Sequence, residues 1–108
     1  MENHLSIFDR LPDVEVKFIF NGFKKKAIYD GYHPMHLISD NYLTTGLHHY
    51  YDLKYVEPTG TAFGTITFIT PEAYPNTLKI GSSIPIYEGE YVIGYAIVTK
   101  VFNRILCS

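Results

Sequence analysis

Turn-forming residues recur about every ten residues along this chain and divide it into short segments. The predicted turns are centred on Asn21-Gly22, Asp30-Gly31, Ser39-Asp40-Asn41, Pro58-Thr59-Gly60, Pro75-Asn76, Ile80-Gly81-Ser82 and Glu88-Gly89-Glu90. Each contains a residue that tolerates a positive φ, or a proline that fixes φ, where a strand must reverse. No segment sustains the spacing of an amphipathic helix, and only residues 5–11 allow one short helical turn.

Between the turns, apolar and polar residues alternate with the period of a strand that has one buried face. Residues 14–18 place apolar side chains at even positions and charges at odd ones. In residues 47–55 the apolar residues take the odd positions, which predicts a packed His49 and a surface His48. Residues 91–102 are almost all apolar or small, so we expect a strand that is covered on both faces.

A chain of 108 residues fits one domain. Short strands joined by regular turns predict an all-β fold, and a closed barrel is favoured because it leaves no exposed strand edge. We therefore expect a six- or seven-stranded antiparallel β-barrel over residues 13–108. Residues 1–12 precede the first clean strand and are predicted to be an N-terminal appendage.

Charge and cysteine content exclude several classes of protein. The formal net charge of -2 leaves no large basic field for nucleic acid or anionic lipid. The single cysteine, Cys107, excludes an internal disulfide and a cysteine-based zinc finger, which favours a reducing compartment. The chain contains neither a secretory signal pattern nor an apolar run that could cross a membrane, so we expect a cytoplasmic protein that makes no membrane contact.

The residues that could carry chemistry form no recognisable catalytic or metal-binding pattern. His33 and His36 would point to opposite faces of a strand, and no cysteine completes a site with the adjacent His48 and His49. The acidic residues are scattered, and Ser82-Ser83 lacks the glycines of a nucleophile elbow. We expect no metal, no cofactor and no enzyme activity.

Three motifs in order give the chain a resemblance to the C-terminal (third) β-barrel domain of elongation factor Tu. Gly31-Tyr32-His33-Pro34 resembles the family's Gly-Tyr-Arg-Pro motif, and Pro58 and Pro71 keep its spacing of two prolines around a hydrophobic strand. Ile86-Tyr87-Glu88-Gly89, followed by residues 94–101, is similar to the family's Ile-x-Glu-Gly turn and the strand after it. The resemblance covers residues 13–103 and implies the same barrel fold.

The resemblance also implies where a partner would bind. The family holds the T-arm of aminoacyl-tRNA with basic side chains of this barrel, but the corresponding arginines are here His33, Tyr87 and Tyr91. Phosphate contact needs fixed positive charge, which the tyrosines do not supply. The nucleotide-binding domain has no counterpart, because no phosphate-binding loop motif occurs, and we expect no bound nucleotide.

The ten tyrosines favour a protein interface, because they supply large and stiff contact area, although partial burial in the barrel explains about half of them equally well. The Lys24-Lys25-Lys26 run is either a solvated loop or an electrostatic contact with an acidic protein or RNA. The candidate partner-binding residues are Tyr87, Glu88, Gly89, Glu90, Tyr91, Tyr32, His33, Lys24, Lys25 and Lys26.

Two functions of different classes follow. The first is a non-catalytic protein-binding module, in one version an immunity protein or inhibitor that neutralises a toxin linked to tRNA or elongation factor Tu. The second is a tRNA- or RNA-binding translation accessory domain, supported by the retained Glu88-Gly89 turn and the lysine run. The net charge and the lost arginines favour the protein partner.

Overall fold

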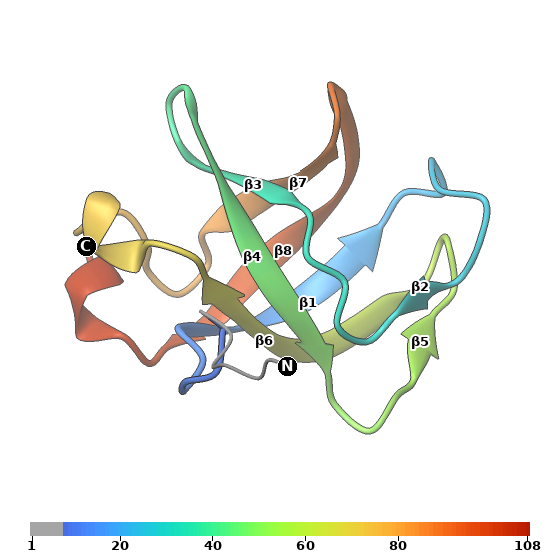
Figure 1. Cartoon of the computed structure of the whole chain (residues 1–108), viewed down its shortest axis with the longest axis horizontal. Coiled ribbons are helices and arrows are strands. Elements are labelled where there is room, and N and C mark those ends of the chain that lie inside the picture. The colour runs from blue at the N-terminus through green and yellow to red at the C-terminus, as the bar shows by residue number, and fades with distance from the viewer. Residues whose placement is uncertain (1–7) are drawn as a thin grey trace, which may run out of the picture.

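The computed structural model describes residues 8–108, and its long strands form a closed antiparallel barrel (Figure 1). The strands follow the order β1-β6-β4-β3-β7-β8 around the barrel. Their bounds are Val14–Phe20 (β1), Met35–Ser39 (β3), Tyr42–Tyr50 (β4), Thr61–Phe68 (β6), Ser83–Glu88 (β7) and Tyr91–Val101 (β8). The predicted all-β barrel is confirmed, with six strands.

The remaining described elements are short. The strands β2 (Ile28–Tyr29) and β5 (Tyr55–Val56) pair with each other in a separate two-stranded sheet at one side of the barrel (Figure 1). Helical structure within residues 8–108 is limited to two 3-10 turns, η1 (Pro71–Ala73) and η2 (Arg104–Leu106). The helical turn predicted over residues 5–11 begins in residues 1–7, outside the described residues.

Strands reverse where the turn-forming residues predict it. The residues with a positive φ at predicted turns are Gly22, Gly31, Asn41, Asn76, Gly81 and Gly89. Glycine and asparagine adopt this conformation at little cost, so their positions determine where each strand can end. One further residue, Asp52, has a φ of 57° at a turn that was not predicted from the sequence.

The turn at Asp52 overturns the predicted orientation of the two adjacent histidines. β4 ends at Tyr50, and its buried positions are the even ones, which include His48 and Tyr50. Tyr51, Leu53 and Tyr55, which set the apolar face in the alternation, lie beyond the strand and are exposed. The prediction of a packed His49 and a surface His48 was therefore wrong, and the two are reversed.

The prediction for the last strand was also wrong. β8 was expected to be covered on both faces, but its burial alternates, with Tyr91, Tyr95 and Lys100 exposed. Side chains of a barrel strand alternate between the interior and the outside. The apolar outer residues of β8 therefore form part of the molecular surface instead of a second buried layer.

Aromatic side chains fill the barrel interior. Phe18 of β1 packs edge-on against Tyr50 of β4, with ring centroids 5.0 Å apart, and both are fully buried. Phe68 of β6 packs in the same way against Tyr74, at 5.9 Å. Edge-to-face pairs of this kind add about 0.5–1.5 kcal/mol beyond the apolar area that they bury.

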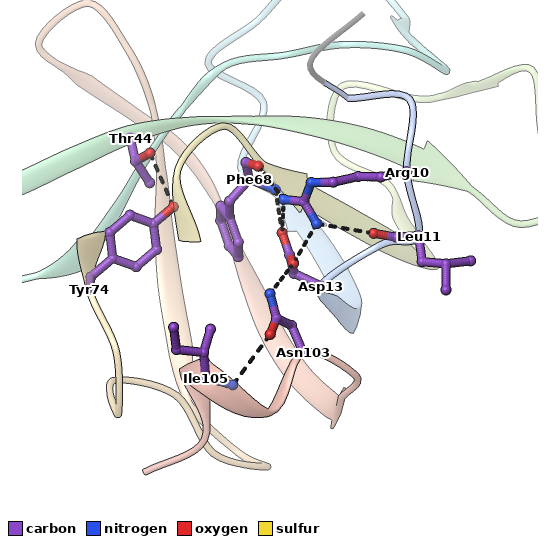
Figure 2. A network of polar contacts seen from close by, with 8 residues as sticks. All are labelled: Arg10, Leu11, Asp13, Thr44, Phe68, Tyr74, Asn103 and Ile105. Carbon is purple, nitrogen blue, oxygen red and sulfur yellow. Dashed lines mark hydrogen bonds and ion pairs between the residues drawn. The ribbon is translucent and has the colours of Figure 1, made fainter. Parts of the chain in front are cut away.

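A buried carboxylate joins three segments at one end of the barrel (Figure 2). Asp13 accepts two hydrogen bonds of 2.9 Å from the Arg10 guanidinium, one of 2.7 Å from the Phe68 backbone N–H and one of 2.9 Å from the Asn103 side chain. The hydrogen bond to Asp13 raises the pKa of Arg10. This contact attaches Arg10, in the predicted appendage, to the barrel.

Replacing Asp13 by asparagine is expected to destabilise the barrel strongly. Asp13→Asn removes the charge that Arg10 faces and half of the acceptor capacity of the side chain. We expect a loss of about 3 kcal/mol in the free energy of unfolding, at the low end for a buried ion pair because the Arg10 side chain is 35% exposed. Urea unfolding monitored by circular dichroism measures it.

Asp9→Asn is the matched control, because Asp9 is an exposed carboxylate in the same segment. Its substitution should change the free energy of unfolding by less than about 0.5 kcal/mol. An Asp13→Asn variant as stable as Asp9→Asn would contradict the role assigned to Asp13.

Candidate functional site

β3 and β7 are neighbours in the barrel (Figure 1), and the barrel has its shortest ladder between them. These two strands pair only through Met35 with Tyr87 and His36 with Ile86, whereas β1 and β8 pair along their length. The next position along β7 is Pro85, which has no backbone N–H to extend the ladder. We call this junction the seam, and several of the predicted partner-binding residues lie beside it.

Three side chains form a polar cluster across the outside of the seam, which we call the clasp: Lys24, Tyr32 and Glu88. Glu88 Oε1 accepts a hydrogen bond of 2.7 Å from Lys24 Nζ and another from the Tyr32 hydroxyl. Lys24 Nζ also lies 5.0 Å from the centroid of the Tyr32 ring, a distance at which a cation and an aromatic face attract. The clasp connects the loop after β1, the segment before β3 and the end of β7.

The clasp fixes the charge state of its members. Hydrogen bonds from Lys24 and then Tyr32 hold the pKa of Glu88 below its usual value. Burial, and then the hydrogen bond to Glu88, raises the pKa of Tyr32. At neutral pH Glu88 is therefore a carboxylate, ion-paired with Lys24, and Tyr32 is a neutral phenol.

An exposed aromatic pair lies next to the clasp in sequence. Phe23 and Tyr91 stack with ring centroids 4.8 Å apart and an interplanar angle of 20°, and they are 45% and 59% exposed. The Asn21 side chain positions this pair, because it accepts the Phe23 backbone N–H at 2.9 Å and donates to the Val92 carbonyl at 2.8 Å. The loop after β1 is thereby attached to the start of β8.

The structure brings some predicted residues together and leaves others apart. Lys24, Tyr32 and Glu88 meet in the clasp, while Gly89 and Glu90 form the exposed turn that follows. Tyr87 is half-buried in the seam, and Tyr91 stacks on Phe23. The remaining three residues, His33, Lys25 and Lys26, are exposed. Lys25 Nζ lies 3.4 Å from the Gly22 carbonyl and takes no part in the clasp.

Sequence reasoning missed Phe23 and the interior of the seam. Phe23 could have been found, because a large apolar residue directly after the Asn21-Gly22 turn has no strand face to occupy. The buried histidine pair could not have been found from the sequence, because the alternation of residues 47–55 places His48 on the wrong face.

Two buried histidines face each other behind the seam. His36 of β3 and His48 of β4 have their Nε2 atoms 2.7 Å apart, and both rings are buried. Phe18 and Phe68 pack against them. Gly46 makes room for this arrangement, because a Cβ atom there would lie 2.9 Å from Cε1 of His36.

The hydrogen-bond partners assign one proton arrangement to the pair. His36 Nδ1 lies 3.2 Å from the Thr44 carbonyl, which only accepts, so this nitrogen carries the hydrogen and His36 Nε2 is an acceptor. His48 Nε2 must then donate to His36 Nε2. This leaves His48 Nδ1 to accept from the Tyr50 hydroxyl, 3.0 Å away. The result is a directed chain from Tyr50 through His48 and His36 to Thr44.

Burial keeps both rings neutral. It lowers the pKa of His36 to about 4, against the opposing effect of hydrogen bonds to the Thr44 and Pro34 carbonyls. Burial, and then the neighbouring His36, lowers the pKa of His48 as well. Two nitrogen ligands of a tetrahedral zinc site lie about 3.3 Å apart, so at 2.7 Å the rings share a hydrogen instead of a metal.

The other places to consider for a metal or a ligand lie away from the seam. Within residues 8–108 no three histidine, cysteine or acidic side chains group closely enough to hold a metal. A hollow of about 430 Å³ is lined by Asp13 and Arg10, whose polar atoms are already paired with each other. A second, of about 460 Å³, is lined by residues of the 52–57 segment and Thr61.

Comparison with family models and with curated proteins adds no relative. No family model matches this chain, and no curated protein matches it in sequence. The resemblance to the third domain of elongation factor Tu stays a prediction. No helix among the described residues is long and apolar enough to cross a membrane.

The directed chain predicts an unusual pair of histidine spectra at pH 7.5. Nitrogen-15 NMR of the rings should find His36 protonated at Nδ1 and His48 protonated at Nε2. A scalar coupling across the hydrogen bond between the two Nε2 nuclei should be measurable, because they lie 2.7 Å apart. The same tautomer in both rings, or the absence of this coupling in folded protein, would contradict the assignment.

Proposed function

We propose that this chain is a non-catalytic protein-binding module that uses the outer surface of the seam. We define this surface by the clasp (Lys24, Tyr32 and Glu88) together with Phe23 and Tyr91. The observation that carries the proposal is the exposed Phe23–Tyr91 stack, held in place by Asn21 beside a closed polar cluster.

The stack has the properties of an interface anchor. Exposed aromatic side chains contribute more binding free energy than most residues when a partner covers them. Stacking already limits the rotational freedom of both rings, and hydrogen bonds hold the side chains of the clasp in place. Binding would therefore lose little side-chain entropy, since the surface is ordered before the partner arrives.

The charge of this surface favours a protein over tRNA. Lys24, one of the three consecutive lysines, is paired with Glu88 at 2.7 Å and offers no free charge to a phosphate. Lys25 and Lys26 remain exposed, but Glu90 lies in the neighbouring turn. The tRNA- or RNA-binding alternative rests on these two lysines and on the Glu88-Gly89 turn.

The biological role that we propose rests on the resemblance described above. A barrel similar to the third domain of elongation factor Tu could occupy a site meant for that factor. This suits a cytoplasmic immunity protein or inhibitor that neutralises a toxin linked to tRNA or elongation factor Tu. No catalytic step is part of the proposal.

Removal of the aromatic stack should abolish partner binding. The binding by the unchanged chain should depend little on salt. We expect the immobilised chain to retain a protein in stoichiometric amount from a native lysate of the source cell. Phe23→Ala/Tyr91→Ala should lose it, because each ring should contribute about 1–3 kcal/mol. Retention by the unchanged chain should be similar at low and high salt, since the anchors are uncharged.

Lys25→Gln/Lys26→Gln is the matched control in the same loop and should keep the partner. Thermal unfolding of all variants establishes that they are folded. Full retention by a folded Phe23→Ala/Tyr91→Ala variant would show that the surface is wrong. Salt-sensitive tRNA binding that Lys25→Gln/Lys26→Gln abolishes would favour the RNA-binding alternative.

A further inference from the structure

We infer that the buried histidines make the seam an acid-sensitive latch, which closes the barrel while both rings are neutral and releases β3 from β7 when a proton is added. The latch consists of His36, His48 and Tyr50. It is an inference about the conformation of the barrel, and it holds whatever partner the outer surface binds.

The latch sits on the part of the barrel with the least backbone support. His36 is one of only two β3 residues that pair with β7, and its side chain is the one that contacts His48. A ring that moves to accommodate a new proton therefore disturbs one of the two residue pairs that close the seam. The longer ladders that β1 forms with β6 and with β8 contain no histidine.

An additional proton would disrupt the directed chain at either of the nitrogens that could take it. The only two unprotonated ring nitrogens are His36 Nε2, which accepts from His48, and His48 Nδ1, which accepts from Tyr50. A proton on His36 Nε2 would place two N–H groups against each other at 2.7 Å. A proton on His48 Nδ1 would force the buried Tyr50 hydroxyl to turn its own hydrogen away from its acceptor.

The surroundings supply no counter-charge for a protonated ring. β1 contributes Phe18 and Phe20, and β6 contributes Phe68. The buried side chains of β7 and β8 are all apolar: Ile84, Ile86, Ile93, Ala96 and Val98. Burial of an unpaired charge is among the most costly changes in a protein interior.

The titratable groups that face the latch are tyrosines. Tyr50 belongs to it, the Tyr32 ring packs edge-on against His48 with centroids 5.7 Å apart, and the Tyr74 hydroxyl lies 3.2 Å from Thr44. Two carboxylates are one step further away. Asp30 accepts from the Tyr50 backbone N–H and Glu88 from the Tyr32 hydroxyl, so both are already committed.

The pH window follows from the sign of the shifts. The pKa of both histidines is lowered in the closed barrel, so the opened form binds protons at a higher pH. The stabilisation is complete above the ordinary histidine pKa of about 6.5 and is lost as the pH falls toward about 4. Hydrogen bonds from Lys24 and Tyr32 hold the pKa of Glu88 below its usual value, so the opened histidines begin to take up protons at a higher pH than the clasp carboxylate does.

The latch is connected to the outer surface through Tyr32. The ring of Tyr32 packs against His48 inside, and its hydroxyl binds Glu88 outside. Release of the seam would therefore displace the clasp and with it the partner-binding surface. This last consequence rests on the proposed function, whereas the opening of the seam does not.

Amide hydrogen exchange between pH 7.5 and 5 tests the latch in the full chain. After correction for intrinsic exchange rates, protection in β3 and β7 should fall on the order of 10-fold or more, and protection in β1 and β8 much less. In His36→Gln/His48→Gln, each side-chain amide supplies one donor and one acceptor, as the neutral imidazole does, but it takes up no proton. The loss of protection at pH 5 should therefore disappear in this variant. The exposed His49→Gln is the matched control and should keep it.

Wild-type NMR keeps the test decisive if the double variant does not fold. The coupling between the two Nε2 nuclei should vanish at the same pH at which β3 and β7 lose protection. Protection that stays constant, or that falls equally in all strands, would overturn the latch. So would a folded double variant that retains the wild-type pH dependence.

Partner retention at pH 5.5 separates this inference from the proposed function. Wild-type chain should release its partner there, and the double glutamine variant should keep it. If the seam opens in acid but no partner is retained at any pH, the proposed function fails and the latch stands. If a partner is retained equally at both pH values while the seam opens, the connection through Tyr32 is wrong.

Discussion

The buried carboxylate of Asp13 is the interaction on which the closure of the barrel depends. Its side chain takes hydrogen bonds from Arg10, from the end of β6 and from Asn103 after β8. Its backbone adds bonds to Ile66 and to the N–H groups of Phe102 and Asn103. Because β1 pairs with both β6 and β8, one residue fastens all three strands at the same end.

The two sides of the barrel therefore differ in stability, and the candidate site lies on the weaker one. Opposite the β6-β1-β8 ladders, β3 and β7 share two residue pairs and depend on side chains for the rest. A polar clasp spans this seam outside, and inside it a neutral imidazole pair joins His36 of β3 to His48 of β4. Sites that must respond to a partner or to the solvent are drawn from regions of low local stability.

The sequence allowed the fold to be predicted further than the site. Glycine and asparagine residues predict most of the chain reversals. The alternation of apolar and charged residues predicts β1 and its buried face correctly. The failure began at Asp52, an aspartate in the left-handed conformation that no pattern marks, and it reversed the faces of β4 and hid His48. The clasp was beyond prediction as a unit, since Lys24 and Glu88 meet only through the barrel topology.

Pro85 has a consequence that reaches beyond a single molecule. It directly precedes the first β7 residue that pairs with β3 and has no backbone N–H to donate, and it stays in β7 when the strands separate. An unpaired strand edge ordinarily invites edge-to-edge association between copies of a protein, and proline is one of the residues that blunt it. If the seam opens in acid as we infer, Pro85 would therefore oppose aggregation of the opened form and so favour its closing again.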